Sequence, residues 1–135
     1  MSPWVEAILR FLLAVALGAA IGFQRERAGK AAGLRTHILV GSGAALFTLV
    51  SIYGFLGATV DISRVAAGVV VGVGFIGAGV ILRGAREEEV AGLTTAATIW
   101  VTAGIGLAAG AGMYLLSVIA TVVIIGILLL PKIRG

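Results

Sequence analysis

Apolar residues run almost without interruption through five stretches of this chain, and polar residues gather in the connections between them. Each stretch is about 18 to 20 residues long, which is enough for a helix to cross the hydrocarbon layer of a bilayer. The predicted spans are 5–23, 37–56, 65–82, 93–110 and 113–130. The pattern therefore predicts an all-α integral membrane protein, in which residues 1–135 form a single domain, a helical bundle with five transmembrane helices.

Composition supports this prediction. Hydrophobic residues make up 60% of the chain, charged residues only 12%, and the mean hydropathy is +1.16. A water-soluble fold of this size would expose far too much apolar surface. The spans and their connections occupy the 135 residues, so we expect no globular catalytic domain within this sequence. Cysteine is absent, which excludes disulfides and thiolate metal sites.

The first apolar stretch could be mistaken for a cleavable signal peptide. A secretory signal carries its positive charge before the apolar region. Here the basic residues Arg25, Arg27 and Lys30 follow it. We therefore expect residues 5–23 to be retained as a transmembrane helix.

Basic residues alternate between the ends of the predicted spans. They follow the first span at Arg25, Arg27, Lys30 and Arg35, the third at Arg83 and Arg86, and the fifth at Lys132 and Arg134. Only Arg10 and Arg64 fall on the other side. The positive-inside rule then places the N-terminus outside and the C-terminus in the cytoplasm. The net charge of +4 is a topology signal, and we expect the lipid bilayer, not nucleic acid, as the partner of this surface.

Glycine is the main candidate for helix packing, with 21 residues in the chain. Small residues four apart share a helix face and let two backbones approach closely in lipid. Such pairs are Gly18 with Gly22, Gly68 with Gly72, and Gly106 with Gly110; Gly74, Gly77 and Gly79 add further small positions. For any single pair we favour packing within one chain over a dimer seam, although a homodimer or other homo-oligomer is expected for the protein overall.

The same glycines produce a literal dinucleotide fingerprint, G-x-G-x-x-G, at residues 72–77. That motif requires a strand, a turn and a helix within a parallel sheet. No such pattern surrounds it here, so we assign these glycines to helix packing.

The densest polar chemistry lies where the first span ends and the second begins. Its members are Gln24, Arg25, Glu26, Arg35, Thr36 and His37. One interpretation is a cytoplasmic connection whose charges only fix topology. The other is a functional polar cluster, because polar groups that enter the membrane usually face the interior of the bundle. The sequence leaves both open.

On the predicted outer side, Asp61 and Arg64 flank the start of the third span. The default interpretation is that Asp61 caps this helix. As the only acidic residue between the second and third spans, it could also be the first contact of a cation arriving from outside.

A stripe of hydroxyl groups marks the fourth span. Thr94, Thr98 and Thr102 recur every four residues, with Thr95 adjacent to the first of them. Such hydroxyls commonly donate to carbonyl groups of their own helix, which is the interpretation we favour. Lining a polar path across the membrane is the alternative.

Catalytic arrangements are not apparent. The single histidine, His37, lies near the predicted inner surface and Asp61 near the outer one, so a Ser-His-Asp triad cannot assemble in one subunit. A histidine-based metal site is also missing. We expect a protein that is not an enzyme. If it binds a metal, the best candidate ligands are Glu26 and Asp61, whose oxygens suit Mg²⁺, the one cofactor we consider.

These residues resemble the membrane domain of the MgtC/SapB family. The resemblance rests on blocks at residues 21–26 and 32–37, 63–67, 72–81 and 92–100, which cover nearly the whole chain in the order found in that family. It implies a multi-pass protein of the bacterial inner membrane, linked to magnesium limitation, acid stress and virulence. For some members it implies inhibition of the F-type ATP synthase. Many members continue into a soluble C-terminal domain that this sequence does not include, and most have Glu at the position of Gln24.

Two functional hypotheses follow. The leading one is a membrane protein of magnesium homeostasis that binds a membrane partner such as the F-type ATP synthase. The alternative is an oligomeric transporter or channel for Mg²⁺ or another cation. We expect Arg35, Glu26, Thr36 and Asp61 to be the residues whose replacement impairs function most at the least cost to insertion.

Overall fold

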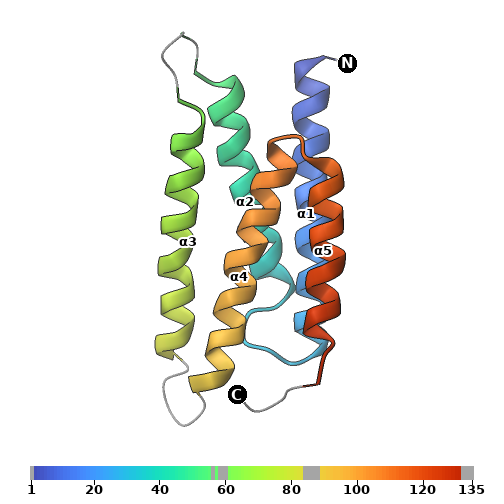
Figure 1. The fold of residues 1–135 in the computed structure, drawn as a ribbon, viewed down its shortest axis with the longest axis vertical. Coiled ribbons are helices and arrows are strands. Elements are labelled where there is room, and N and C mark those ends of the chain that lie inside the picture. The colour runs from blue at the N-terminus through green and yellow to red at the C-terminus, as the bar shows by residue number, and fades with distance from the viewer. Residues whose placement is uncertain (1, 56, 58–60, 84–88, 132–135) are drawn as a thin grey trace.

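The computed structural model describes residues 2–55, 57, 61–83 and 89–131, and the described residues contain helices without strands. Five helices follow one another: α1 (Pro3–Arg27), α2 (Leu34–Tyr53), α3 (Ser63–Arg83), α4 (Glu89–Gly110) and α5 (Tyr114–Leu128). They run up and down beside one another as an elongated bundle (Figure 1). The predicted all-helical membrane bundle is confirmed.

Four helices are long and apolar enough to cross a bilayer. These spans are Pro3–Arg27, Leu34–Tyr53, Ser63–Ile81 and Gly92–Gly110. Helix α5 has 15 residues, fewer than the predicted span 113–130. At about 1.5 Å per residue it is near 22 Å long, short of a typical hydrocarbon layer. It nevertheless runs back along α1 and α4 toward the other end of the bundle (Figure 1).

Helix α1 is longer than the apolar pattern predicts. It continues through Arg27, because Gln, Arg and Glu are good helix formers even where the apolar run has ended. It stops at Gly29, whose φ of 73° is left-handed. There the amide of Lys30 donates to the carbonyl of Arg25 and that of Gly29 to the carbonyl of Glu26, the Schellman pattern of helix termination. Thus Gln24, Arg25 and Glu26 lie on a helix, not in a connection.

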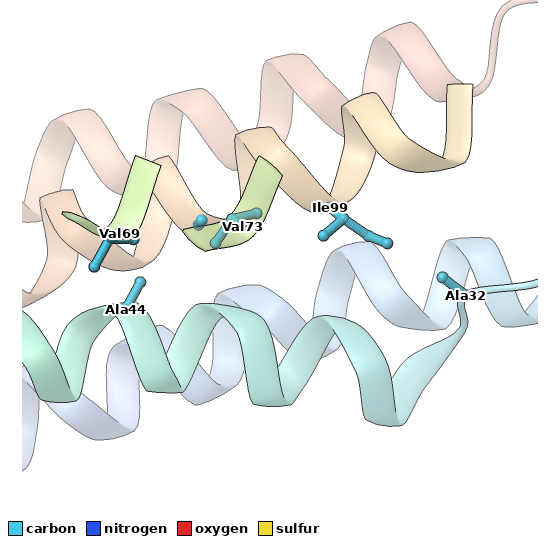
Figure 2. Packing of buried hydrophobic residues seen from close by; sticks show 6 residues of the cluster. Ala32, Ala44, Val69, Val73 and Ile99 are labelled. Carbon is cyan, nitrogen blue, oxygen red and sulfur yellow. The ribbon is translucent and has the colours of Figure 1, made fainter. Parts of the chain in front are cut away.

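Helices α1, α2 and α4 form the centre of the bundle. Helix α2 packs on both α1 and α4, α5 packs on α1 and α4, and α3 contacts α4 more than α2. Figure 2 shows the largest apolar cluster of the described residues, in which Val69 of α3 lies near Ala44 of α2 and Ile99 of α4 lies further along the bundle, toward Ala32. Large apolar side chains instead cover the outside, for example Phe75, which is 78% exposed. That exposed surface is suited to lipid.

Close backbone contacts hold α2 against both neighbours. A Cβ atom added at Gly18 would lie 2.6 Å from the carbonyl oxygen of His37, and one at Gly22 would lie 2.8 Å from Cα of Leu34. On the other side of α2, Gly106 sits directly against the carbonyl of Gly41. Only glycine permits helices to approach this closely, so two of the glycine pairs in the sequence lie at helix contacts within the chain.

Candidate functional site

Arg25 is the most unusual residue of the polar cluster, because its side chain is buried. It is only 3% exposed, between the ends of α1 and α4. Its Nη2 donates to Oγ1 of Thr95, 3.1 Å away, while its Nε has no partner. A buried guanidinium held by a neutral hydroxyl is costly, since charges in protein interiors are usually paired.

His37 lies beside it in the interior and is fully buried. Its Nδ1 is 2.8 Å from the carbonyl oxygen of Gly33, the residue that precedes the first turn of α2. A carbonyl can only accept, so Nδ1 carries a proton. In the neutral ring Nε2 is then an acceptor, and neither this atom nor the buried Oε1 of Gln24 has a partner.

Glu26 faces away from Arg25 and caps the next helix. Its Oε1 accepts the backbone N–H of Leu34, the first residue of α2, at 2.9 Å. The carboxylate lies so close to Gly33 that a side chain there would collide with it. An acidic group at a helix N-terminus satisfies a free N–H and interacts favourably with the helix dipole.

The remaining members of the predicted cluster lie in the first turn of α2. Arg35 is exposed and Thr36 is partly exposed. The structure therefore divides the predicted cluster in two. Gln24, Arg25 and His37 bring polar atoms into the interior, whereas Glu26 and Arg35 remain at the surface.

Asp61 lies at the other end of the bundle, just before α3. Its Oδ1 accepts from the backbone N–H of Ser63 at 3.1 Å and from the Ser63 hydroxyl at 2.7 Å. These hydrogen bonds lower the pKa of the Asp61 carboxyl from its ordinary value. Arg64, in the first turn of α3, is exposed. Of the two interpretations of Asp61, the geometry matches a helix cap.

The threonine stripe is mostly buried, but its hydroxyls are occupied locally. Oγ1 of Thr98 donates to the carbonyl of Thr94 at 2.8 Å, and Oγ1 of Thr102 donates to the carbonyl of Thr98 at 2.7 Å. Oγ1 of Thr95 accepts the hydrogen bond from Arg25, and Thr94 is exposed. Hydroxyls that donate to their own helix offer little to a permeating ion.

The glycines of α3 mostly face away from the rest of the chain. No atom lies within 4 Å of a Cβ built at Gly68, Gly72, Gly74 or Gly79, whereas one at Gly77 would touch Ala96 at 3.4 Å. Packing within one chain therefore does not explain the Gly68 and Gly72 pair.

Gly68 and Gly72 instead border an apolar groove of about 450 Å³ between α2 and α3. From α2 the groove is lined by Leu39, Gly43 and Phe47 among others. It is open to the outside of the bundle, where lipid or another helix would lie.

A polar network around Arg10 was not predicted from the sequence. Arg10 donates from Nε to Glu6 at 2.9 Å and to the Tyr114 hydroxyl at 3.3 Å, and from Nη1 to the Gly110 carbonyl at 3.1 Å. Tyr114 also hydrogen-bonds Glu6, and Arg10 lies over the ring of Tyr53. This network ties α1 to α2 and to the α4–α5 turn, and its side chains already satisfy one another, which favours a structural role.

The described side chains do not form a metal centre. No group of three or more His, Asp or Glu residues comes together among them. The two candidate ligands, Glu26 and Asp61, lie at opposite ends of the bundle, next to the α1–α2 loop and the start of α3 respectively (Figure 1). One chain therefore cannot bring them to the same ion.

Comparison with known proteins places the chain in a family. The model of the MgtC family matches residues 11–133. "Putative magnesium transporter YhiD" of Escherichia coli (strain K12) is 53% identical over 123 residues, covering 87% of this chain and 56% of that protein. "Protein SrpB" of Synechococcus elongatus is 44% identical over 128 residues, covering 87% and 70% respectively.

"Protein MgtC" of Salmonella typhimurium is 45% identical over 118 residues, covering 87% of this chain and 49% of that protein. The chain thus spans about half the length of several curated relatives that it matches. No solved structure matches it.

Proposed function

Because the chain belongs to the MgtC family, we propose that it is a bacterial inner-membrane protein of magnesium homeostasis that acts by binding another membrane protein. The magnesium role is supported by the relative named "Putative magnesium transporter YhiD". Bacterial relatives and four apolar spans support the membrane assignment. The F-type ATP synthase is the partner that the family resemblance suggests.

The groove between α2 and α3 is the main structural support for partner binding. Helix α3 is the least buried of the four long spans, because only 11% of its most apolar 18-residue segment is buried inside the bundle. Beside the groove, Gly68, Gly72 and Gly43 leave space in which another backbone could lie close. Helix association in membranes relies on close approach of this kind.

The polar side chains give less support to transport by a single chain. The threonine hydroxyls of α4 donate to their own helix, and the carboxylates of Glu26 and Asp61 cap helices at opposite ends. A cation crossing the membrane needs oxygen ligands along its way. The described part of one chain offers no continuous series of them.

An oligomeric cation transporter is the second candidate. The outward-facing glycines of α3 favour it, because a second copy could pack there as readily as a different protein. A path would then have to form between subunits, with Asp61 at its entrance.

Photo-crosslinking in cells distinguishes these possibilities. A photoreactive residue at Ile76, which lines the groove, is compared with one at Val122, which is exposed on α5. We expect Ile76 to capture a membrane protein in magnesium-starved cells and Val122 to capture none. Capture of only a second copy at Ile76 would favour the oligomeric transporter. Absence of any protein adduct at Ile76 would contradict partner binding through the groove.

A further inference from the structure

Arg25 carries a buried positive charge for which the described side chains supply no negative partner. Three acidic side chains are described, Glu6, Glu26 and Asp61. Glu6 and Asp61 lie at the opposite end of the bundle (Figure 1), and Glu26 is exposed and caps α2. The ion pair found among the described residues joins Arg10 to Glu6. Arg25 cannot lose its proton, so the charge itself remains.

The guanidinium of Arg25 carries the one full charge that the described side chains bring into the interior at this end of the bundle. Helices α2 and α4 begin at this end of the bundle and α1, α3 and α5 end there, so the partial charges of the helix termini are of both signs (Figure 1). His37 is close enough to interact electrostatically with Arg25 and offers no negative charge. The full charge of the Arg25 guanidinium itself therefore repels a cation such as Mg²⁺ and attracts an anion.

The donor atom that needs a partner is the Nε of Arg25, which is sealed from solvent and makes no hydrogen bond. A water molecule could accept from it but would leave the charge uncompensated. An anion does both, because it accepts the hydrogen bond and neutralises the guanidinium.

We propose that the interior around Arg25 and Thr95 is a binding site for a small monovalent anion of the size of chloride. The side chain is 3% exposed, so a phosphate or a lipid headgroup cannot reach it without major rearrangement. A halide is smaller than either of these ligands and therefore requires less separation of the ends of α1, α2 and α4. The anion accepts from Nε while Nη2 keeps its bond to Thr95. This anion site depends on the buried charge of Arg25 and not on the proposed magnesium role.

The test uses the purified chain in lipid nanodiscs without Mg²⁺ or any partner. Sodium gluconate is replaced by sodium chloride from 10 to 300 mM at constant ionic strength, and thermal unfolding is followed. Ligands that bind only the folded state raise Tm, and we expect a rise of roughly 5 °C for a site that saturates in this range. The variant Arg25→Gln should lose the rise. Arg35→Gln, which removes an exposed arginine from the same end, should keep it.

Three results would overturn the proposal. The Tm of the original chain could stay unchanged by chloride, the rise in Tm could persist in Arg25→Gln, or Arg35→Gln could lose the rise as completely as Arg25→Gln does. An unchanged Tm would also be the outcome if residues 87–89, which are all Glu, supplied the counter-charge. If Arg25→Gln does not fold, Arg25→Lys replaces it. This variant keeps a charge without the guanidinium donors, so a weaker chloride effect is expected, and an unweakened one would contradict the site.

Discussion

Arg25 of α1 donates to Thr95 of α4 across 3.1 Å, although the two residues are 70 positions apart in the sequence. The bond joins the ends of two helices through the one buried arginine among the described residues. Loss of the hydroxyl should therefore affect the whole bundle.

Replacing Thr95 with Val keeps the side-chain shape and removes the acceptor. We expect a loss of about 1.5–3 kcal/mol in the free energy of unfolding, because the buried guanidinium loses a charge-assisted hydrogen bond. Equilibrium unfolding in detergent micelles measures it. The control, Thr98→Val, removes a hydroxyl that donates to its own helix and should cost less than about 1 kcal/mol. Equal effects of the two variants would show that the link to Arg25 contributes nothing.

Gly18 and Gly68 should respond differently to the same added methyl group. At Gly18 the new Cβ would lie 2.6 Å from the His37 carbonyl, so α1 and α2 must separate, at a cost of about 1–3 kcal/mol. At Gly68 nothing lies within 4 Å, and alanine should be neutral or stabilise the helix by up to about 1 kcal/mol. Unfolding midpoints of Gly18→Ala and Gly68→Ala provide the measurement. If the unfolding midpoint of Gly18→Ala equals that of the original chain, the close contact between α1 and α2 is contradicted.

Glu26 distinguishes a helix cap from a cation ligand. Replacement by Ala removes the acceptor of the Leu34 N–H and should cost about 0.5–2 kcal/mol. Replacement by Gln keeps an acceptor oxygen but removes the charge. We therefore expect Glu26→Gln to fold nearly as stably as the original and to support growth in low magnesium. If Glu26→Gln fails in that growth assay while remaining folded, the carboxylate charge has a role beyond capping.

Asp61 should make the start of α3 sensitive to acid. Hydrogen bonds from Ser63 lower its pKa below the ordinary value of 3.8, so its stabilising contribution is complete at neutral pH and declines as pH falls through the lowered pKa. The Asp61→Asn variant keeps a capping oxygen that does not titrate. We expect the difference in Tm between the original chain and this variant to be constant from pH 7 to 5 and to change below about pH 4. A change centred near pH 6 would point to another group.

The helices could be predicted from the sequence because each apolar run is long and each glycine pair lies on one helix face. Gly18 and Gly22 lie at a helix contact, as their spacing predicts. Periodicity does not reveal which face meets which neighbour. Gly68 and Gly72 have the same spacing, yet they face away from the chain.

The candidate site was less predictable than the fold. Arg25 is buried because α1 continues past its apolar run and because Thr95 of α4 packs against it. The local sequence around Arg25 does not predict this contact with a residue of another helix. The network of Arg10 with Tyr114 is likewise formed by residues 104 positions apart. Ser117 and Thr121 of α5 are also buried, and their hydroxyls donate to carbonyl groups of their own helix.

Ion flux is the sharpest test of whether this chain acts by binding a partner without itself carrying Mg²⁺. The purified chain is reconstituted in proteoliposomes beside the variants Asp61→Ala and Arg35→Ala at equal density, and Mg²⁺ uptake is measured. We expect uptake no greater than in empty liposomes for all three, although the protein is folded. Saturable uptake by the original chain that is lost in both variants would contradict the account and establish an oligomeric transporter.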